Sequence, residues 1–86
     1  MITHGTDTMV ETAKEIASKN LNKTIIITGA MIPYALKNSD STFNLANALA
    51  YVLTLKAGVY IVMNGRYFHW DNVQKNKTLG IFETVR

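Results

Sequence analysis

Cysteine is absent from this chain of 86 residues, so neither a disulfide nor a zinc site built on thiolates can form. The absence fits a reducing compartment, and we expect a cytoplasmic protein. Long apolar runs are also missing: no stretch approaches the roughly 20 residues of a membrane-spanning helix, so we predict no membrane association. Charged residues make up only 17% of the chain, and its lysines are scattered rather than clustered. We therefore predict no nucleic-acid partner.

The residues that are present describe a small ordered domain. Its 86 residues allow at most one domain, and an apolar fraction of 48% is too high for a disordered segment. The chain has a single proline, Pro33, and no linker or internal repeat marks a second unit. We therefore treat residues 1–86 as one folded unit.

Two segments have the apolar spacing of an amphipathic helix. The first runs from Thr8 to Ser18, and Thr8 and Glu11 have the spacing of a capping box that would fix its start. The second runs from about Ser41 to Lys56, with Gly58 as its stop signal.

Three segments have the pattern of β-strands. Met1–Thr3 reads as the end of a strand, while Lys23–Thr28 and Val59–Met63 are short apolar runs typical of parallel strands buried on both faces. The element order is therefore β-α-β-α-β, followed by a short irregular tail. This order predicts a Rossmann-like α/β fold with three layers, a parallel sheet and right-handed helical crossovers.

Three loops follow the carboxyl ends of these strands: His4–Thr8, Gly29–Asp40 and Asn64–Lys77. Ligands of open parallel sheets bind outside the carboxyl ends of the strands. We therefore expect the functional residues of this chain on one rim of the sheet.

The first loop carries the residues best suited to chemistry. Thr6, Asp7 and Thr8 precede a helix, where backbone N–H groups favour a polarised or anionic ligand group. A threonine hydroxyl reacts as a nucleophile only when a base takes its proton. Asp7 is adjacent, and Lys75 of the third loop can reach the same rim and act as a base when desolvated. The alternative is that Thr6–Thr8 only cap the helix, the commoner role of such residues, and that Lys75 is solvated.

The two histidines and the loop aromatics offer weaker signals. His4 and His69 have no third ligand at a suitable spacing, so we predict packing or loop roles and no metal site. Tyr34, Tyr67 and Trp70 either line a pocket or pack in the core, and packing is the default role.

Four motifs in order resemble the bacterial-type L-asparaginase family, and together they cover nearly the whole chain. They are Thr3–Met9, Ile27–Pro33, the segment from Ser39-Asp40 to Phe43-Asn44-Leu45, and Val62–Arg66. Lys75 falls where the family has a catalytic lysine. The end of the chain is similar to short, single-domain members of the family.

The resemblance implies hydrolysis of the side-chain amide of L-asparagine, and often of L-glutamine, to the acid and ammonia without a metal or organic cofactor. It implies that Thr6, Asp7 and Lys75 are catalytic: the threonine activates water, relays a proton or acts as nucleophile, and the lysine accepts the proton. It also implies that Gly5, Thr6, Asp7 and Ala30 bind substrate, the aspartate through the α-amino group and the alanine through its backbone carbonyl.

The family's other catalytic threonine lies in a Thr-Gly-Gly-Thr segment that these 86 residues lack. We therefore expect residues 1–86 to be the later half of an asparaginase N-terminal domain. Two hypotheses follow: part of an active amidohydrolase, or a truncated, non-catalytic domain that folds or oligomerises without turnover. Under both, the 86 residues alone should show little or no activity. They should also form a homo-oligomer, because strand surface lacks partners.

Overall fold

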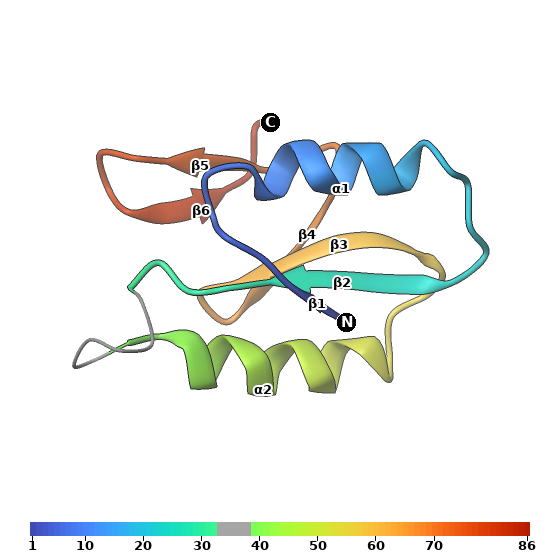
Figure 1. Ribbon diagram of the computed structural model, residues 1–86, viewed down its shortest axis with the longest axis horizontal. Helices are drawn as coiled ribbons and strands as arrows, with labels where there is room; N and C mark the ends of the chain where they lie inside the picture. The colour runs from blue at the N-terminus through green and yellow to red at the C-terminus, as the bar shows by residue number, and fades with distance from the viewer. Residues whose placement is uncertain (33–38) are drawn as a thin grey trace.

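A computed structural model describes residues 1–32 and 39–86 of the chain (Figure 1). Its middle layer is a four-stranded sheet in the order β1-β2-β3-β4. The strands are β1 (Ile2–Thr3), β2 (Thr24–Thr28), β3 (Gly58–Met63) and β4 (Arg66–His69). The first three strands are parallel, and β4 is antiparallel to β3. Pro33 and Tyr34, which the sequence places in a loop, lie outside the described residues.

Two helices cover opposite faces of this sheet: α1 (Met9–Ala17) on one side and α2 (Ser41–Val52) on the other (Figure 1). Side chains alternate along the strands, so neighbouring residues of one strand enter different cores. Ile27 and Ile61 pack in the core beneath α1, whereas Ile26 and Val62 pack in the core beneath α2. The predicted α/β fold with three layers is therefore confirmed.

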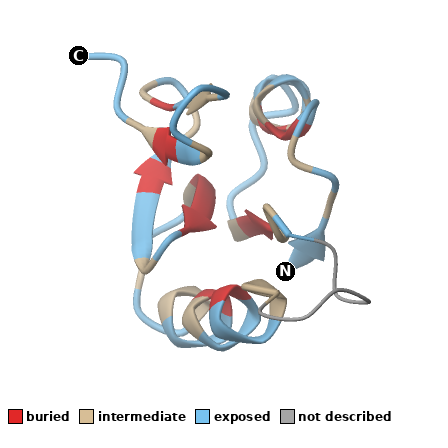
Figure 2. Cartoon of the chain, turned by 90° about the vertical axis from the view of Figure 1, so that its left-hand side faces the viewer, coloured by how far each residue is buried: buried red, intermediate tan, exposed pale blue. Residues whose placement is uncertain are grey.

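The prediction that both crossovers are right-handed is wrong. Parallel strands β1, β2 and β3 follow one another across the sheet, yet their connecting helices lie on opposite faces, so the two crossovers have opposite hands. The β1-α1-β2 unit is right-handed and the β2-α2-β3 unit is left-handed (Figures 1 and 2), a form found in roughly 2% of such units. Val73 and Phe82 from the end of the chain pack beneath α1, on the face of the sheet opposite α2.

The tail after β3 is ordered, and the prediction of an irregular tail is wrong. Asn64 and Gly65 have φ of 57° and 76° and form a two-residue turn, with Met63 paired to Arg66 across it. Farther on, β5 (Gln74–Asn76) and β6 (Ile81–Glu83) form a second, two-stranded sheet on the α1 side of the molecule (Figure 1). The β5–β6 hairpin is anchored by Phe82, which is 1% exposed.

The start of α1 and the end of α2 differ from the sequence prediction. Thr8 is the N-cap residue of α1, but its side chain makes no capping hydrogen bond, so the predicted capping box does not form. Its φ of −118° and ψ of 15° lie outside the extended region that a capping side chain requires. Helix α2 ends at Val52, earlier than predicted, and Gly58 is the first residue of β3. The backbone N–H of Gly58 donates to the carbonyl of Lys23 (2.9 Å), which draws the chain into the sheet.

Candidate active site

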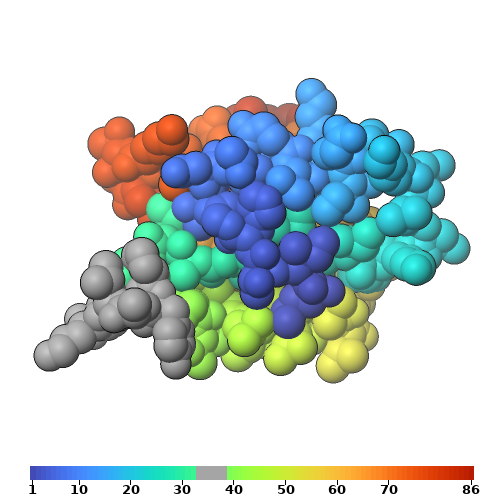
Figure 3. Space-filling model, in the orientation of Figure 1, coloured from blue at the N-terminus to red at the C-terminus, as the bar shows by residue number. Residues whose placement is uncertain are grey.

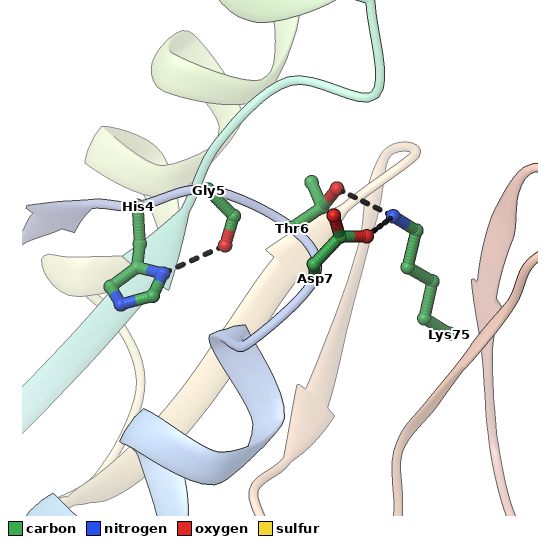
Figure 4. Close-up of polar contacts among 5 residues, drawn as sticks. All are labelled: His4, Gly5, Thr6, Asp7 and Lys75. Atoms are coloured by element: carbon green, nitrogen blue, oxygen red, sulfur yellow. Dashed lines mark hydrogen bonds and ion pairs between the residues drawn. The ribbon is translucent and has the colours of Figure 1, made fainter.

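Thr6, Asp7 and Lys75 meet at the carboxyl rim of the sheet (Figure 4). The ammonium nitrogen of Lys75 donates to the Thr6 hydroxyl oxygen at 2.8 Å and to Asp7 Oδ1 at 2.6 Å. Thr6 and Asp7 belong to the loop between β1 and α1, and Lys75 lies in β5. The three predicted catalytic residues therefore form one cluster, and Thr6 and Asp7 are bonded to the lysine rather than to the start of the helix.

The loop that carries Thr6 is held from both ends. The backbone N–H of His4 donates to the carbonyl of Thr28 at 2.8 Å, which extends the pairing of β1 with β2. The His4 ring lies 2.7 Å from the Gly5 carbonyl through Nδ1 (Figure 4). Its Nε2 lies 2.9 Å from the Thr12 hydroxyl. In the neutral ring, Nδ1–H donates to the carbonyl and Nε2 accepts from the hydroxyl. His4 thus ties the loop to α1, the structural role that the sequence predicted.

The charges in the cluster differ in their contact with water. The side chain of Lys75 is 17% exposed, whereas that of Asp7 is 80% exposed. The hydrogen bond and the positive charge of Lys75 hold the pKa of Asp7 below its ordinary value, with a smaller contribution from Lys77. Asp7 is therefore an anion at neutral pH, open to a positively charged group of a ligand.

The remaining predicted site residues line a different hollow. Thr6, Asp7 and Lys75 line a pocket of about 280 Å³. Gly5 and Ala30 line a second pocket of about 510 Å³. The larger pocket also includes residues from the ends of β1 and β2 and from the start of α2: Thr3, His4, Thr28, Gly29, Ser41, Thr42 and Leu45. Residues of the His4–Thr8 loop line both pockets. Figure 3 shows this N-terminal segment at the surface above α2.

A buried polar network beneath this rim was not predicted. Asn44 of α2 is 0% exposed, and its amide nitrogen donates to the Gly29 carbonyl (2.9 Å) and to Asp40 Oδ2 (2.9 Å). Its amide oxygen accepts the backbone N–H of Asn64 at 3.2 Å. The sequence did offer one signal: an asparagine stands at a position of the predicted helix that the apolar periodicity assigns to the buried side.

Asp40 completes this network from the N-cap position of α2. Its carboxylate accepts the backbone N–H groups of Met31 and Ile32, at 3.1 Å and 3.0 Å. Partial burial acts to raise the pKa of Asp40, but the hydrogen bonds from Ile32, Met31 and the Asn44 side chain outweigh it and lower the pKa. Asp40 is thus an anion that organises the backbone after β2.

The other residues considered for chemistry have packing roles. His69 lies against the rings of Tyr60 and Tyr67, with centroid separations of 5.1 Å and 6.1 Å, and Trp70 packs against the core beneath α1. Within residues 1–32 and 39–86, no three His, Cys, Asp or Glu side chains lie close enough to hold a metal ion. No helix of the same residues is long and apolar enough to cross a membrane.

Comparison with known proteins places this rim in a family context. The sequence model of a family described as "Asparaginase, N-terminal" matches residues 1–84. L-asparaginase 1 of Escherichia coli is 49% identical over 78 residues, which is 87% of this chain and 23% of that protein. L-asparaginase 2 of E. coli is 36% identical over 85 residues, which is 94% of this chain and 24% of that protein.

Solved structures give the same result. The thermostable L-asparaginase from Thermococcus kodakarensis superimposes with a TM-score of 0.88 at 30% identity, over 98% of this chain and 27% of that one. A structure described as a probable cytoplasmic L-asparaginase from Campylobacter jejuni superimposes with a TM-score of 0.87 at 34% identity, over 96% of this chain and 28% of that one. The chain thus spans about a quarter of the length of the relatives it matches.

Proposed function

This chain belongs to the asparaginase family. We propose that it forms part of an L-asparaginase-type amidohydrolase. The substrate is the side-chain amide of L-asparagine, with that of L-glutamine as the alternative, and the products are the acid and ammonia. The observation that carries the proposal is the position of Lys75, whose nitrogen lies within hydrogen-bonding distance of both Thr6 and Asp7.

The proposed reaction divides the work among these three residues. Lys75, once its ammonium group has given up a proton to solvent, accepts a proton from the Thr6 hydroxyl, directly or from a water that the hydroxyl holds. If the activated oxygen is that of water, it attacks the amide carbon, the carbon–nitrogen bond breaks, the proton leaves with the ammonia, and the acid forms directly. If it is that of Thr6, the same step leaves an ester on Thr6, which a water molecule then hydrolyses to release the acid and restore the hydroxyl. Neither a metal nor an organic cofactor takes part in this scheme.

Substrate binding follows from charge and backbone geometry. The exposed Asp7 carboxylate is an acceptor for the α-amino group of an amino-acid substrate. Gly5 and Ala30 line the neighbouring pocket, where the backbone carbonyl of Ala30 would accept a hydrogen bond from the substrate amide. We thus propose Gly5, Thr6, Asp7 and Ala30 as substrate-binding residues.

We further propose that residues 1–86 are the later half of an asparaginase N-terminal domain and supply one part of the site. They contain no Thr-Gly-Gly segment. Removal of one member of a catalytic group costs orders of magnitude in rate. The 86-residue chain alone should therefore release ammonia from L-asparagine slowly or not at all.

The proposal is tested in a chimera in which residues 1–86 replace the matching segment of E. coli L-asparaginase 1, a relative of 49% identity over 78 residues. The chimera should release ammonia from L-asparagine, and Thr6→Val should lower the rate by about 10²–10⁴-fold. Thr8→Val is the matched control, because the Thr8 side chain makes no capping bond. A folded chimera without activity, or equal losses from the two valine variants, would contradict the proposal.

A further inference from the structure

We propose that Asn44 is a positioning residue that holds both the loop carrying Ala30 and the hairpin carrying Lys75. This inference rests on the proposed function for the roles of Ala30 and Lys75. The contacts of Asn44 do not depend on that function. No catalytic contact is assigned to Asn44 itself.

Both the nitrogen and the oxygen of the buried Asn44 side chain have hydrogen-bond partners. A primary amide without partners is costly to bury, so its bonds must offset the loss of water. Its nitrogen bonds to Gly29 and Asp40, its oxygen accepts from Asn64, and the residue is 0% exposed. These bonds join the segment after β2 to the segment after β3, so one side chain of α2 links two loops of the rim.

The first branch fixes the backbone on both sides of Ala30. Before it, the Gly29 carbonyl accepts from the Asn44 amide at 2.9 Å. After it, the N–H groups of Met31 and Ile32 donate to the Asp40 carboxylate. None of these bonds uses the carbonyl of Ala30, a residue that lines the larger pocket.

The second branch reaches Lys75 through Asn64. The side-chain oxygen of Asn64 accepts the backbone N–H of Phe82 at 3.3 Å, and Phe82 is the residue paired with Lys75 across β5 and β6. Asn64 has φ of 57°, a conformation that asparagine tolerates well, so the turn presents its side chain to the hairpin without a glycine. The distance from Lys75 to Thr6 therefore depends on a turn that Asn44 holds.

The test uses nuclear magnetic resonance of the 86-residue chain and needs no turnover. Two readouts report the hairpin: the exchange rate of the Phe82 amide hydrogen and the pKa of the Asp7 carboxyl, which Lys75 lowers. The chemical shifts of the Met31 and Ile32 amides report the loop. Asn44→Ala should change the Asp7 pKa and the Met31 and Ile32 amide shifts. Because it also removes the acceptor of the Asn64 backbone N–H, it should make the Phe82 amide exchange about tenfold faster, the effect of one lost hydrogen bond.

Three further variants separate positioning from loss of stability. Asn47→Ala is the matched control: it is the same change on the same helix, at a residue whose amide nitrogen donates within α2, to the Phe43 carbonyl. Asn64→Gly keeps the positive φ and should raise the Asp7 pKa and speed Phe82 exchange without moving the loop signals. Asn44→Asp keeps an acceptor for Asn64 but loses the donor to Gly29, so it should move the loop signals most.

Two results would overturn the proposal. In one, Asn44→Ala and Asn47→Ala have the same effects, which would make Asn44 an ordinary helix residue. In the other, Asn64→Gly leaves the Asp7 pKa and Phe82 exchange unchanged. This second result tests the proposal even if Asn44→Ala fails to fold. An inactive chimera, by contrast, would remove the proposed function and leave these readouts as they are.

Discussion

The ammonium nitrogen of Lys75 lies 2.8 Å from the hydroxyl oxygen of Thr6, although 69 positions of sequence separate the two residues. A loop at the end of β1 supplies the threonine, and the β5–β6 hairpin supplies the lysine. Their contact depends on how the end of the chain packs beside α1, because Phe82, opposite Lys75 in the hairpin, is buried in that core. Chemistry and packing are therefore coupled, and each can be tested separately.

The first prediction concerns the pH dependence of Asp7. Because Lys75 lowers its folded-state pKa below the ordinary 3.8, ionised Asp7 stabilises the fold above that value, and this contribution is lost as the pH falls through the folded-state pKa. Lys75→Met should raise the Asp7 pKa toward 3.8, as followed by the carboxyl carbon resonance. Lys77→Met should raise it less, since Lys77 makes the smaller contribution. An equal shift in the two variants would show that Lys75 is not the main partner.

A second prediction concerns the close approach of β1 and β2. A β-carbon at Gly29 would collide with the backbone carbonyl oxygen of His4. The His4 backbone cannot move away easily, because the His4 N–H donates to the Thr28 carbonyl. Gly29→Ala should therefore lower the free energy of unfolding by about 1–3 kcal/mol, measured by urea denaturation. Gly5→Ala is the control, because a β-carbon there meets no atom within 4 Å. Equal stability of the two variants would contradict the packing described.

The main elements of this fold could be predicted because their signals are local. The run Thr24–Thr28 is β-branched, α2 has helical periodicity, and the polar residues Thr6 and Asp7 follow a strand. The β3–β4 turn could also have been predicted from Asn64-Gly65, the strongest short-range hairpin signal.

Other features depend on contacts between distant segments and have no local signal. The left-handed crossover depends on which face of the sheet α2 covers, and nothing within α2 indicates that face. The capping box of Thr8 and Glu11 fits the pattern but fails on the backbone angles at Thr8. The division of the predicted site residues between two pockets likewise required the path of the loop in space.

A third prediction concerns self-association. Leu49 and Leu53 of the α2 region are 50% and 84% exposed, and no charged residue occurs between positions 41 and 55. We predict that the chain self-associates through this surface, so that sedimentation gives a mass above 9.6 kDa. Leu53→Glu should shift it toward the monomer, whereas Leu79→Glu, at a residue 67% exposed on the hairpin, should not. A monomer at all concentrations would contradict this prediction.

The most direct test of the account is the turnover number of the chimera with Lys75 intact and with Lys75→Met. If Lys75 accepts the proton from Thr6 or its water, the substitution should lower kcat for L-asparagine by about 10²–10⁴-fold. Lys77→Met, on the same hairpin, should leave kcat close to that of the unsubstituted chimera. A Lys75→Met chimera that turns over as fast as the Lys77→Met chimera would contradict the central claim that Thr6, Asp7 and Lys75 form the catalytic group.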